Sequence, residues 1–123
     1  MPWIVRFADE FEAEFLALPQ RVQDELLAAA RVLADYGPRL GRPYVDTLKG
    51  SKHANMKELR FAAAGGVWRA AFAFDPRREA ILPVAGDKAG SSQNRFYKQF
   101  IAKADKRFTA HLERLKKSTA RKG

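Results

Sequence analysis

Two arginines stand where a β-hairpin would place them side by side. Segments 56–62 and 67–75 have the apolar and aromatic content of strands, and a Gly-Gly pair between them favours a tight turn. In that hairpin Arg60 lies directly opposite Arg69. Like charges in this position destabilise a sheet. The pair therefore either binds an anion or is compensated by a carboxylate, and Glu58 is close enough to be that carboxylate.

The rest of the hairpin predicts which face of the sheet carries the arginines. The same alignment pairs Leu59 with Ala70 and Phe61 with Trp68. These apolar pairs belong on a face that helices cover. Because successive side chains of a strand point to opposite faces, the two arginines are expected on the other, solvent-exposed face.

A second group of candidates follows the segment 80–86. The turn Gly86-Asp87-Lys88-Ala89-Gly90 leads into a helix expected from Ser92, and the unpaired N–H groups of a helix N-terminus bind phosphate, with Lys88 adding a charge beside them. Tyr97 lies one position from the apolar stripe of that helix, where its ring could stack on a base or its hydroxyl could handle a proton. The alternatives are an exposed turn lysine and a tyrosine at the edge of the core.

The segment 38–55 is a long expected loop that is rich in glycine, proline and basic residues. His53 lies among its lysines and could act as a general base near neutral pH. His111, far along the last helix, is expected to be structural. Further candidates for contacts to an RNA backbone, or for a merely solvated surface, are Lys49, Lys52, His53, Lys57, Arg95 and Lys98.

The sequence offers no set of metal ligands and no serine-histidine-aspartate pattern. We therefore expect no metal and no cofactor. A nuclease of this kind would have to cleave RNA, because attack by the 2′-hydroxyl on the adjacent phosphate needs only positioning, charge stabilisation and proton transfer. Arginine and lysine suit the charge, and tyrosine, lysine or histidine suit the protons.

The hydrophobic periodicity predicts the scaffold that positions these residues. Asp9 and Glu12 resemble a capping box at the start of a helix. Pro83 predicts an edge, a bulge or a position without a ladder hydrogen bond in its strand. The expected fold is α+β in the order β-α-α-β-β-β-α, with a small, mainly antiparallel sheet, a helical hairpin and a C-terminal helix. The expected elements are a strand at 3–7, helices from Asp9 and from Pro19 to Gly37, strands at 56–62, 67–75 and 80–86, and a helix from Ser92 to about Leu115.

Charge is distributed unevenly along the chain. Residues 1–36 carry a net charge of −4 and residues 37–123 carry +13, which together give the net charge of +9. The basic part is expected to face a polyanion. We expect one domain over 1–115 and a basic, flexible tail over 116–123. The chain has no cysteine, no visible signal peptide and no apolar run that could span a membrane, so a cytoplasmic protein is expected.

Several of these residues together resemble the RelE/ParE toxin superfamily, and within it the phage-derived Gp49-like, HigB-type toxins of type II toxin–antitoxin systems. The resemblance covers most of residues 3–115 and includes the order of the elements. Each motif alone is weak, but the combination is fairly specific. The motifs are Leu48-Lys49-Gly50, Lys57-Glu58-Leu59-Arg60, Trp68-Arg69-Ala70-Ala71-Phe72, Gly86-Asp87-Lys88 and Phe96-Tyr97.

The resemblance implies a RelE-like fold and a toxin that cleaves mRNA on the ribosome by metal-free 2′-hydroxyl attack. It also implies a cognate antitoxin, often a helix-turn-helix protein. Arg60 and Arg69 would hold the scissile phosphate, with Lys88 and Tyr97 completing the catalytic set, while the general base stays unassigned. Two other functions stay open: poisoning of DNA gyrase within the same superfamily, and nucleic-acid binding without catalysis.

Overall fold

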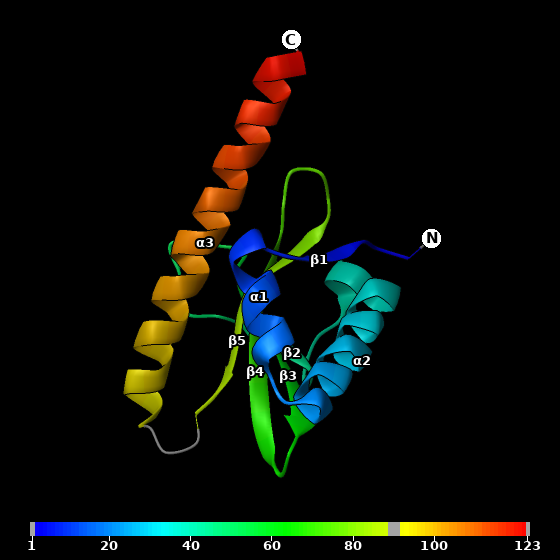
Figure 1. Ribbon diagram of the computed structural model, residues 1–123, viewed down its shortest axis with the longest axis vertical. Coiled ribbons are helices and arrows are strands. Elements are labelled where there is room, and N and C mark those ends of the chain that lie inside the picture. Colours follow the sequence, from blue (N-terminus) through cyan, green and yellow to red (C-terminus); the bar gives the residue numbers. More distant parts are fainter. Residues whose placement is uncertain (1, 89–91, 123) are drawn as a thin grey trace.

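The computed structural model describes residues 2–88 and 92–122, with side chains described as far as Ser118. It confirms an α+β fold built on one five-stranded sheet (Figure 1). The strand order is β1-β5-β4-β3-β2, in which only the β1–β5 pair is parallel. The elements are β1 (Val5–Phe7), α1 (Asp9–Ala17), α2 (Gln20–Tyr36), the 3₁₀ helix η1 (Gly37–Arg39), β2 (Val45–Thr47), β3 (Lys57–Ala63), β4 (Gly66–Phe74), β5 (Ala80–Asp87) and α3 (Gln93–Lys122).

Helices cover both faces of the sheet, which corrects the expectation of one open face. Figure 1 shows α2 and α3 on opposite sides of the strands. The α1–α2 side is packed by Phe11, Phe15, Val22, Leu26, Leu59, Phe72 and Leu82. The α3 side is packed by Met56, Ala71, Ile81, Phe100, Ala104 and Phe108. The face that carries the arginines is therefore covered by α3 over part of its area.

The predicted hairpin register is confirmed. Arg60 is paired with Arg69, with Leu59–Ala70 and Phe61–Trp68 on either side. The turn has positive φ at both central residues, 51° at Ala64 and 80° at Gly65, as a type I′ hairpin turn requires. Of the alternatives at Pro83, the structure has the bulge, because the partners of β4 skip from Ile81 to Val84 between Ala73 and Ala71.

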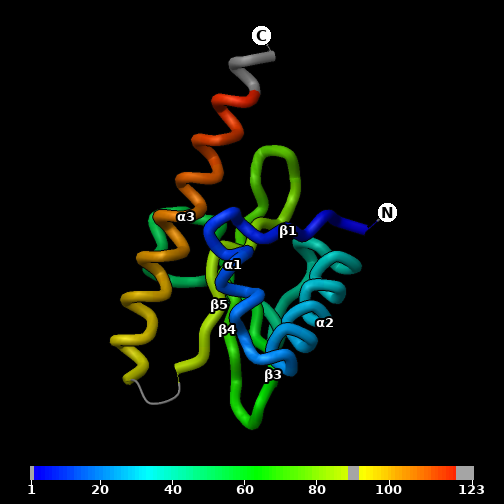
Figure 2. Tube along the Cα trace, viewed as in Figure 1, coloured from blue at the N-terminus to red at the C-terminus, as the bar shows by residue number. Residues whose placement is uncertain are grey.

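Three local expectations differ from the structure. The segment 38–55 contains β2, a strand too short to show alternation, which forms by pairing with β3. The N-cap of α1 is Ala8, which forms no side-chain cap, so the prediction of a capping box at Asp9 is wrong. Asp9 instead lies in the first turn of the helix, where the helix dipole favours an acid. The last helix continues beyond Leu115 to Lys122, and Figure 1 shows its C-terminal turns projecting past the sheet. Figure 2 shows the trace of α3 on the side of the sheet opposite to α2.

The acidic N-terminal part does not stand apart from the basic part. Arg107 of α3 binds Glu14 of α1 at 2.5 Å, and Arg114 lies 3.2 Å from Glu10 and 3.3 Å from Asp9. These pairs join the two helices and neutralise part of the charge of α3. The positive charge available to an outside partner is therefore smaller than the division of charge along the sequence suggests.

These ion pairs predict a loss of stability in acid. Hydrogen bonds from Arg114 and Arg107 hold the pKa values of Glu10 and Glu14, respectively, below the ordinary value of 4.5. Below pH 4.5 the unfolded chain therefore takes up protons before the folded chain does, and the stabilisation is lost as the pH falls through the lowered pKa values. We expect urea unfolding midpoints to fall between pH 7 and pH 3.5, and to fall less in an Arg107→Ala/Arg114→Ala variant. Equal pH dependence in the two proteins would contradict this.

A close contact between Gly37 and Trp3 at the end of α2 predicts that a side chain at position 37 lowers the free energy of unfolding. Gly37 has a φ of 58°, and a Cβ built there would lie 2.2 Å from Nε1 of Trp3. Gly37→Ala is therefore expected to lower the free energy of unfolding by about 2–4 kcal/mol, because the backbone is strained and the indole ring must move. Gly41→Ala is the matched control, since a Cβ at Gly41 has no atom within 4 Å. Denaturant melts that give equal losses for both variants would refute the explanation.

Candidate functional site

One buried carboxylate, that of Glu58, lies at the centre of the predicted site. Its Oε1 accepts hydrogen bonds from Nε of Arg60 at 2.9 Å and from the hydroxyl of Tyr97 at 3.0 Å. The same oxygen lies 3.7 Å from Nε of Arg69. The side chain of Glu58 is only 3% exposed. The structure therefore brings three of the four predicted catalytic residues around one acid, and we call Glu58, Arg60, Arg69 and Tyr97 the Glu58 cluster.

The hairpin and α3 position the Glu58 cluster. Leu59 and Ala70 pair on the α1–α2 face, where both are buried, and this pairing sets the register. Alternation then places residues 58, 60 and 69 on the opposite face. Phe96 and Phe100, stacked with ring centroids 5.0 Å apart, pack α3 onto that face, which brings the intervening Tyr97 to Glu58.

Arg60 already has two acidic partners. Besides Glu58, its Nη2 lies 3.6 Å from Oδ2 of Asp46, which also binds Arg42 at 3.2 Å. The hydrogen bond to Glu58 is the main cause that raises the pKa of the Arg60 guanidinium. A backbone hydrogen bond from Thr47 is the main cause that lowers the pKa of Asp46. Arg60 is thus held at the edge of the sheet by carboxylates on β2 and β3.

Arg69 is in a different environment, and it is not on an open surface as expected. Its side chain is only 13% exposed. The guanidinium lies 6.0 Å from the ring centroid of Phe96 and 5.8 Å from that of Tyr97, so the first turns of α3 cover it. Its buried Nε has no hydrogen-bond partner among the described residues. Arg69 is therefore a buried cation with unused capacity to donate to an anion.

Tyr97 is a neutral hydrogen-bond donor in this arrangement. Burial is the main cause that raises its pKa above 10, and the negative charge of Glu58 adds to it. A phenolate base at neutral pH is therefore disfavoured. The hydroxyl can instead pass a proton to Glu58 while it accepts one from another group.

Lys88 is the fourth predicted catalytic residue. It directly follows β5, in which Gly86 is the partner of Arg69. Its side chain makes no hydrogen bond or ion pair within residues 2–88 and 92–118. The predicted phosphate site at the start of α3 includes Ala89 and Gly90, which lie outside the described residues.

The structure does not bring His53 to the Glu58 cluster. Its Nε2 is 2.9 Å from Oγ1 of Thr109, and its ring packs on Phe108. Thr109 lies twelve residues along α3 from Tyr97, roughly 18 Å at the rise of a helix. The neighbouring backbone N–H of Lys52 binds Asp105 at 3.0 Å. This part of the loop is therefore fastened to α3.

Within the described residues, no hydrogen bond or ion pair joins the other basic candidates to the Glu58 cluster. Lys49, Lys52, Arg95 and Lys98 are exposed, and Lys57 is half-buried on the face of β3 that carries Leu59. His111 lies 2.9 Å from Oδ2 of buried Asp75, which fits its expected structural role. Arg95 and Lys98 flank Tyr97 in α3, so they are the members of this set nearest to the cluster in sequence.

Two acidic residues, Glu58 and Asp46, have larger roles in the site than the sequence indicates. Glu58 was expected only as compensation for the arginines, although its spacing of two from Arg60 already indicates one shared face. Asp46 was not expected to take part at all. Its role depends on β2, which the sequence does not reveal, so no local signal could have placed Asp46 beside Arg60.

Residues 13–109 match the family described as phage-derived protein Gp49-like (DUF891). The chain belongs to this Gp49-like family. It is 46% identical over 96 residues to "Putative toxin HigB2" of Mycobacterium tuberculosis (strain ATCC 25618 / H37Rv), covering 77% of this chain and 47% of the relative. It is 45% identical over 98 residues to "Putative toxin HigB3" of the same organism, covering 80% of this chain and 83% of the relative. The chain thus spans about half the length of HigB2 and most of HigB3.

Within residues 2–88 and 92–122, no three histidine or acidic side chains lie close enough together to hold a metal ion. No helix in the same part of the chain combines the length and the apolar character that crossing a bilayer requires.

Proposed function

We propose that this chain is the toxin of a type II toxin–antitoxin system and that it cleaves mRNA at the Glu58 cluster. The family membership and the two HigB-named relatives support the first part. One observation carries the second: among the described residues, Nε of the buried Arg69 guanidinium has no hydrogen-bond acceptor, and the one carboxylate within ion-pair distance, that of Glu58, is shared with Arg60. A phosphate would supply the missing acceptor. Arg69 would hold it most tightly, and Arg60 would add charge from the edge of the sheet.

The proposed reaction is attack of a ribose 2′-oxygen on the adjacent phosphorus. The new O–P bond forms as the bond from phosphorus to the 5′-oxygen breaks, leaving a cyclic phosphate and a 5′-hydroxyl. Arg60 and Arg69 stabilise the extra negative charge on the phosphate oxygens. The proton of the 2′-hydroxyl passes to the Tyr97 hydroxyl, whose own proton moves to Glu58 over the existing 3.0 Å hydrogen bond. Lys88 is the proposed proton donor to the leaving oxygen.

The surrounding basic residues would hold the rest of the RNA. Arg95 and Lys98 on α3 and the exposed lysines Lys49 and Lys52 are candidates for backbone contacts, as is half-buried Lys57. The proposed setting is the bacterial cytoplasm, with the ribosome presenting the mRNA. The proposed regulator is a cognate antitoxin of the helix-turn-helix type.

Controlled expression in a bacterium tests the proposal. Growth arrest with loss of translation and cleaved mRNA is expected, and primer extension should place the cuts in translated regions. Induction of the SOS response with double-strand breaks would instead indicate gyrase poisoning. Unaffected growth at confirmed expression would indicate nucleic-acid binding without catalysis. Either result would overturn the nuclease assignment.

A further inference from the structure

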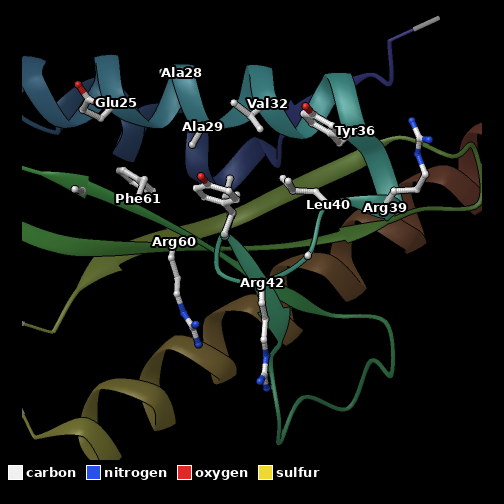
Figure 3. Close-up of a pocket in the computed structure, with 14 residues that line it drawn as sticks. Glu25, Ala28, Ala29, Val32, Tyr36, Arg39, Leu40, Arg42, Arg60 and Phe61 are labelled. Atoms are coloured by element: carbon white, nitrogen blue, oxygen red, sulfur yellow. The ribbon is translucent and has the colours of Figure 1, made fainter.

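A third arginine, Arg42, lies at the edge of the sheet beside the Glu58 cluster. It belongs to the segment between η1 and β2, and its Nη2 lies 3.2 Å from Oδ2 of Asp46. Nη2 of Arg60 lies 3.6 Å from the same oxygen. Figure 3 shows the side chains of Arg42 and Arg60 extending in the same direction, away from α2. Asp46 therefore holds the two guanidiniums close together at this edge of the sheet.

The strand register explains why these charges gather in one place. Asp46 is the direct partner of Glu58 across β2 and β3, and Arg60 is the direct partner of Arg69 across β3 and β4. Directly opposite residues on neighbouring strands point to the same face of a sheet. Arg60 contacts both acids, so the charges alternate across the strands in the order Arg42, Asp46, Arg60, Glu58, Arg69. These five side chains comprise three cations and two carboxylates, which leaves one positive charge in excess.

The exposure of the three arginines increases toward the edge of the sheet. The side chain is 13% exposed at Arg69, 37% at Arg60 and 77% at Arg42. The rings of Phe96 and Tyr97 on α3 lie against the guanidinium of Arg69, at the covered end of this series. Arg42 is at the open end. An RNA strand whose scissile phosphate reaches Arg69 can therefore leave the covered site across β3 and β2, past Arg42.

Arg42 has donor capacity for a ligand of its own. A guanidinium carries several N–H donors in a fixed fork, and among the described residues Asp46 is the one carboxylate within ion-pair distance of Arg42. A single phosphate could not easily bridge Arg42 and Arg60, because the Asp46 carboxylate that both contact would repel it. Two successive phosphates, one on each guanidinium, avoid this repulsion.

We propose that Arg42 forms a second phosphate-binding site, which holds the phosphodiester next to the scissile phosphate on the mRNA strand. Asp46 positions the Arg42 guanidinium and keeps it apart from Arg60. The RNA backbone then crosses β4, β3 and β2 in turn. This inference deepens the proposed nuclease function and rests on it. Since Arg42 binds RNA and takes no part in the bond changes, it should affect the affinity for RNA more than the rate of cleavage.

The test separates binding from cleavage. A short single-stranded RNA with 2′-O-methyl groups cannot undergo attack by the 2′-oxygen, so its fluorescence anisotropy reports binding alone. Titrations over a range of salt concentrations compare the parent protein with Arg42→Ala, Arg42→Lys and Arg39→Ala. Arg39→Ala is the matched control, because it removes the same charge from an exposed side chain that Figure 3 shows pointing away from Arg42 and Arg60.

We expect Arg42→Ala to bind the RNA about fivefold more weakly at low salt, and to reduce the slope of log affinity against log salt by about 0.7, as the loss of one phosphate contact on a single strand requires. Arg39→Ala should keep the parental slope, and so should Arg42→Lys, because a lysine still neutralises one phosphate. In a translation reaction, Arg42→Ala should need more reporter mRNA for half-maximal cleavage but reach the parental maximal rate. Its denaturant melt should match that of the parent, since an exposed ion pair contributes little to stability.

Two results would overturn the inference. Equal affinities and salt slopes for Arg42→Ala and Arg39→Ala would show that no phosphate is bound at Arg42. A lower maximal cleavage rate with unchanged binding would show that Arg42 acts only through Asp46 on Arg60. Failure of the nuclease assignment gives a different result, in which the reporter mRNA stays intact while the salt slope still depends on Arg42.

Discussion

Arg69→Ala is expected to reduce mRNA cleavage by about 100-fold or more, because it removes the guanidinium proposed to bind the scissile phosphate in a site that largely excludes water. The fold should survive, since Glu58 keeps its hydrogen bonds to Arg60 and Tyr97. Because Arg69 is 13% exposed rather than on an open surface, a loss of about 1–2 kcal/mol in the free energy of unfolding is expected as well. The measurements are cleavage of a reporter mRNA during translation and a denaturant melt of the same variant.

Two further variants make the Arg69 result specific. Arg69→Lys keeps the charge but loses the forked donor geometry, so it is expected to restore stability more than cleavage. Arg77→Ala removes an exposed arginine from the β4–β5 turn and should change neither. Parental cleavage by a folded Arg69→Ala protein would remove the residue from the site.

Glu58→Gln is expected to be the most destabilising change in the Glu58 cluster. Among the residues that the structure describes, it leaves Arg69 with no carboxylate and Arg60 with only Asp46, at 3.6 Å. Loss of one partner from a buried ion pair costs about 3 kcal/mol, which for a chain of this size lowers the melting temperature by roughly 10 °C. Cleavage should also be lost, since Glu58 is the proposed final acceptor of the proton. Thermal melts and the reporter assay check both effects.

A double-mutant cycle separates the charge effect from a general loss of packing. Arg69→Met removes the unpaired cation but keeps an unbranched side chain beneath the rings of Phe96 and Tyr97. Glu58→Gln/Arg69→Met should therefore be more stable than Glu58→Gln alone, with a coupling of at least 1 kcal/mol. Glu113→Gln, at a 58% exposed position, is the control and should melt like the parent. Additive losses would show that the ion pair does not hold the cluster together.

Local sequence pattern was sufficient to predict the hairpin and the side-by-side arginines. Strand alternation and a turn with a glycine at a positive-φ position are properties of neighbouring residues, and they set the register of Arg60 against Arg69. An irregularity at Pro83 was likewise predictable, because a missing N–H is a property of one residue, but the choice of a bulge among the alternatives was not. The motifs that carry the family resemblance are likewise continuous in sequence, and the match over residues 13–109 confirmed it.

The environment of those arginines was decided only by tertiary structure. Glu58 becomes the centre of the cluster because Tyr97, thirty-nine residues later, closes over it from α3. Asp46 reaches Arg60 because β2 pairs with β3, and His53 is held away because its loop is fastened to α3. Each of these contacts joins two segments that are distant in sequence. The local sequence of one segment does not indicate its contact with the other, since side-chain packing and ion pairing depend on distances in space. The sequence alone thus determined which side chains share a strand pair. The packing of α3 and β2 determined that Arg69 is the one whose Nε has no hydrogen-bond acceptor among the described residues.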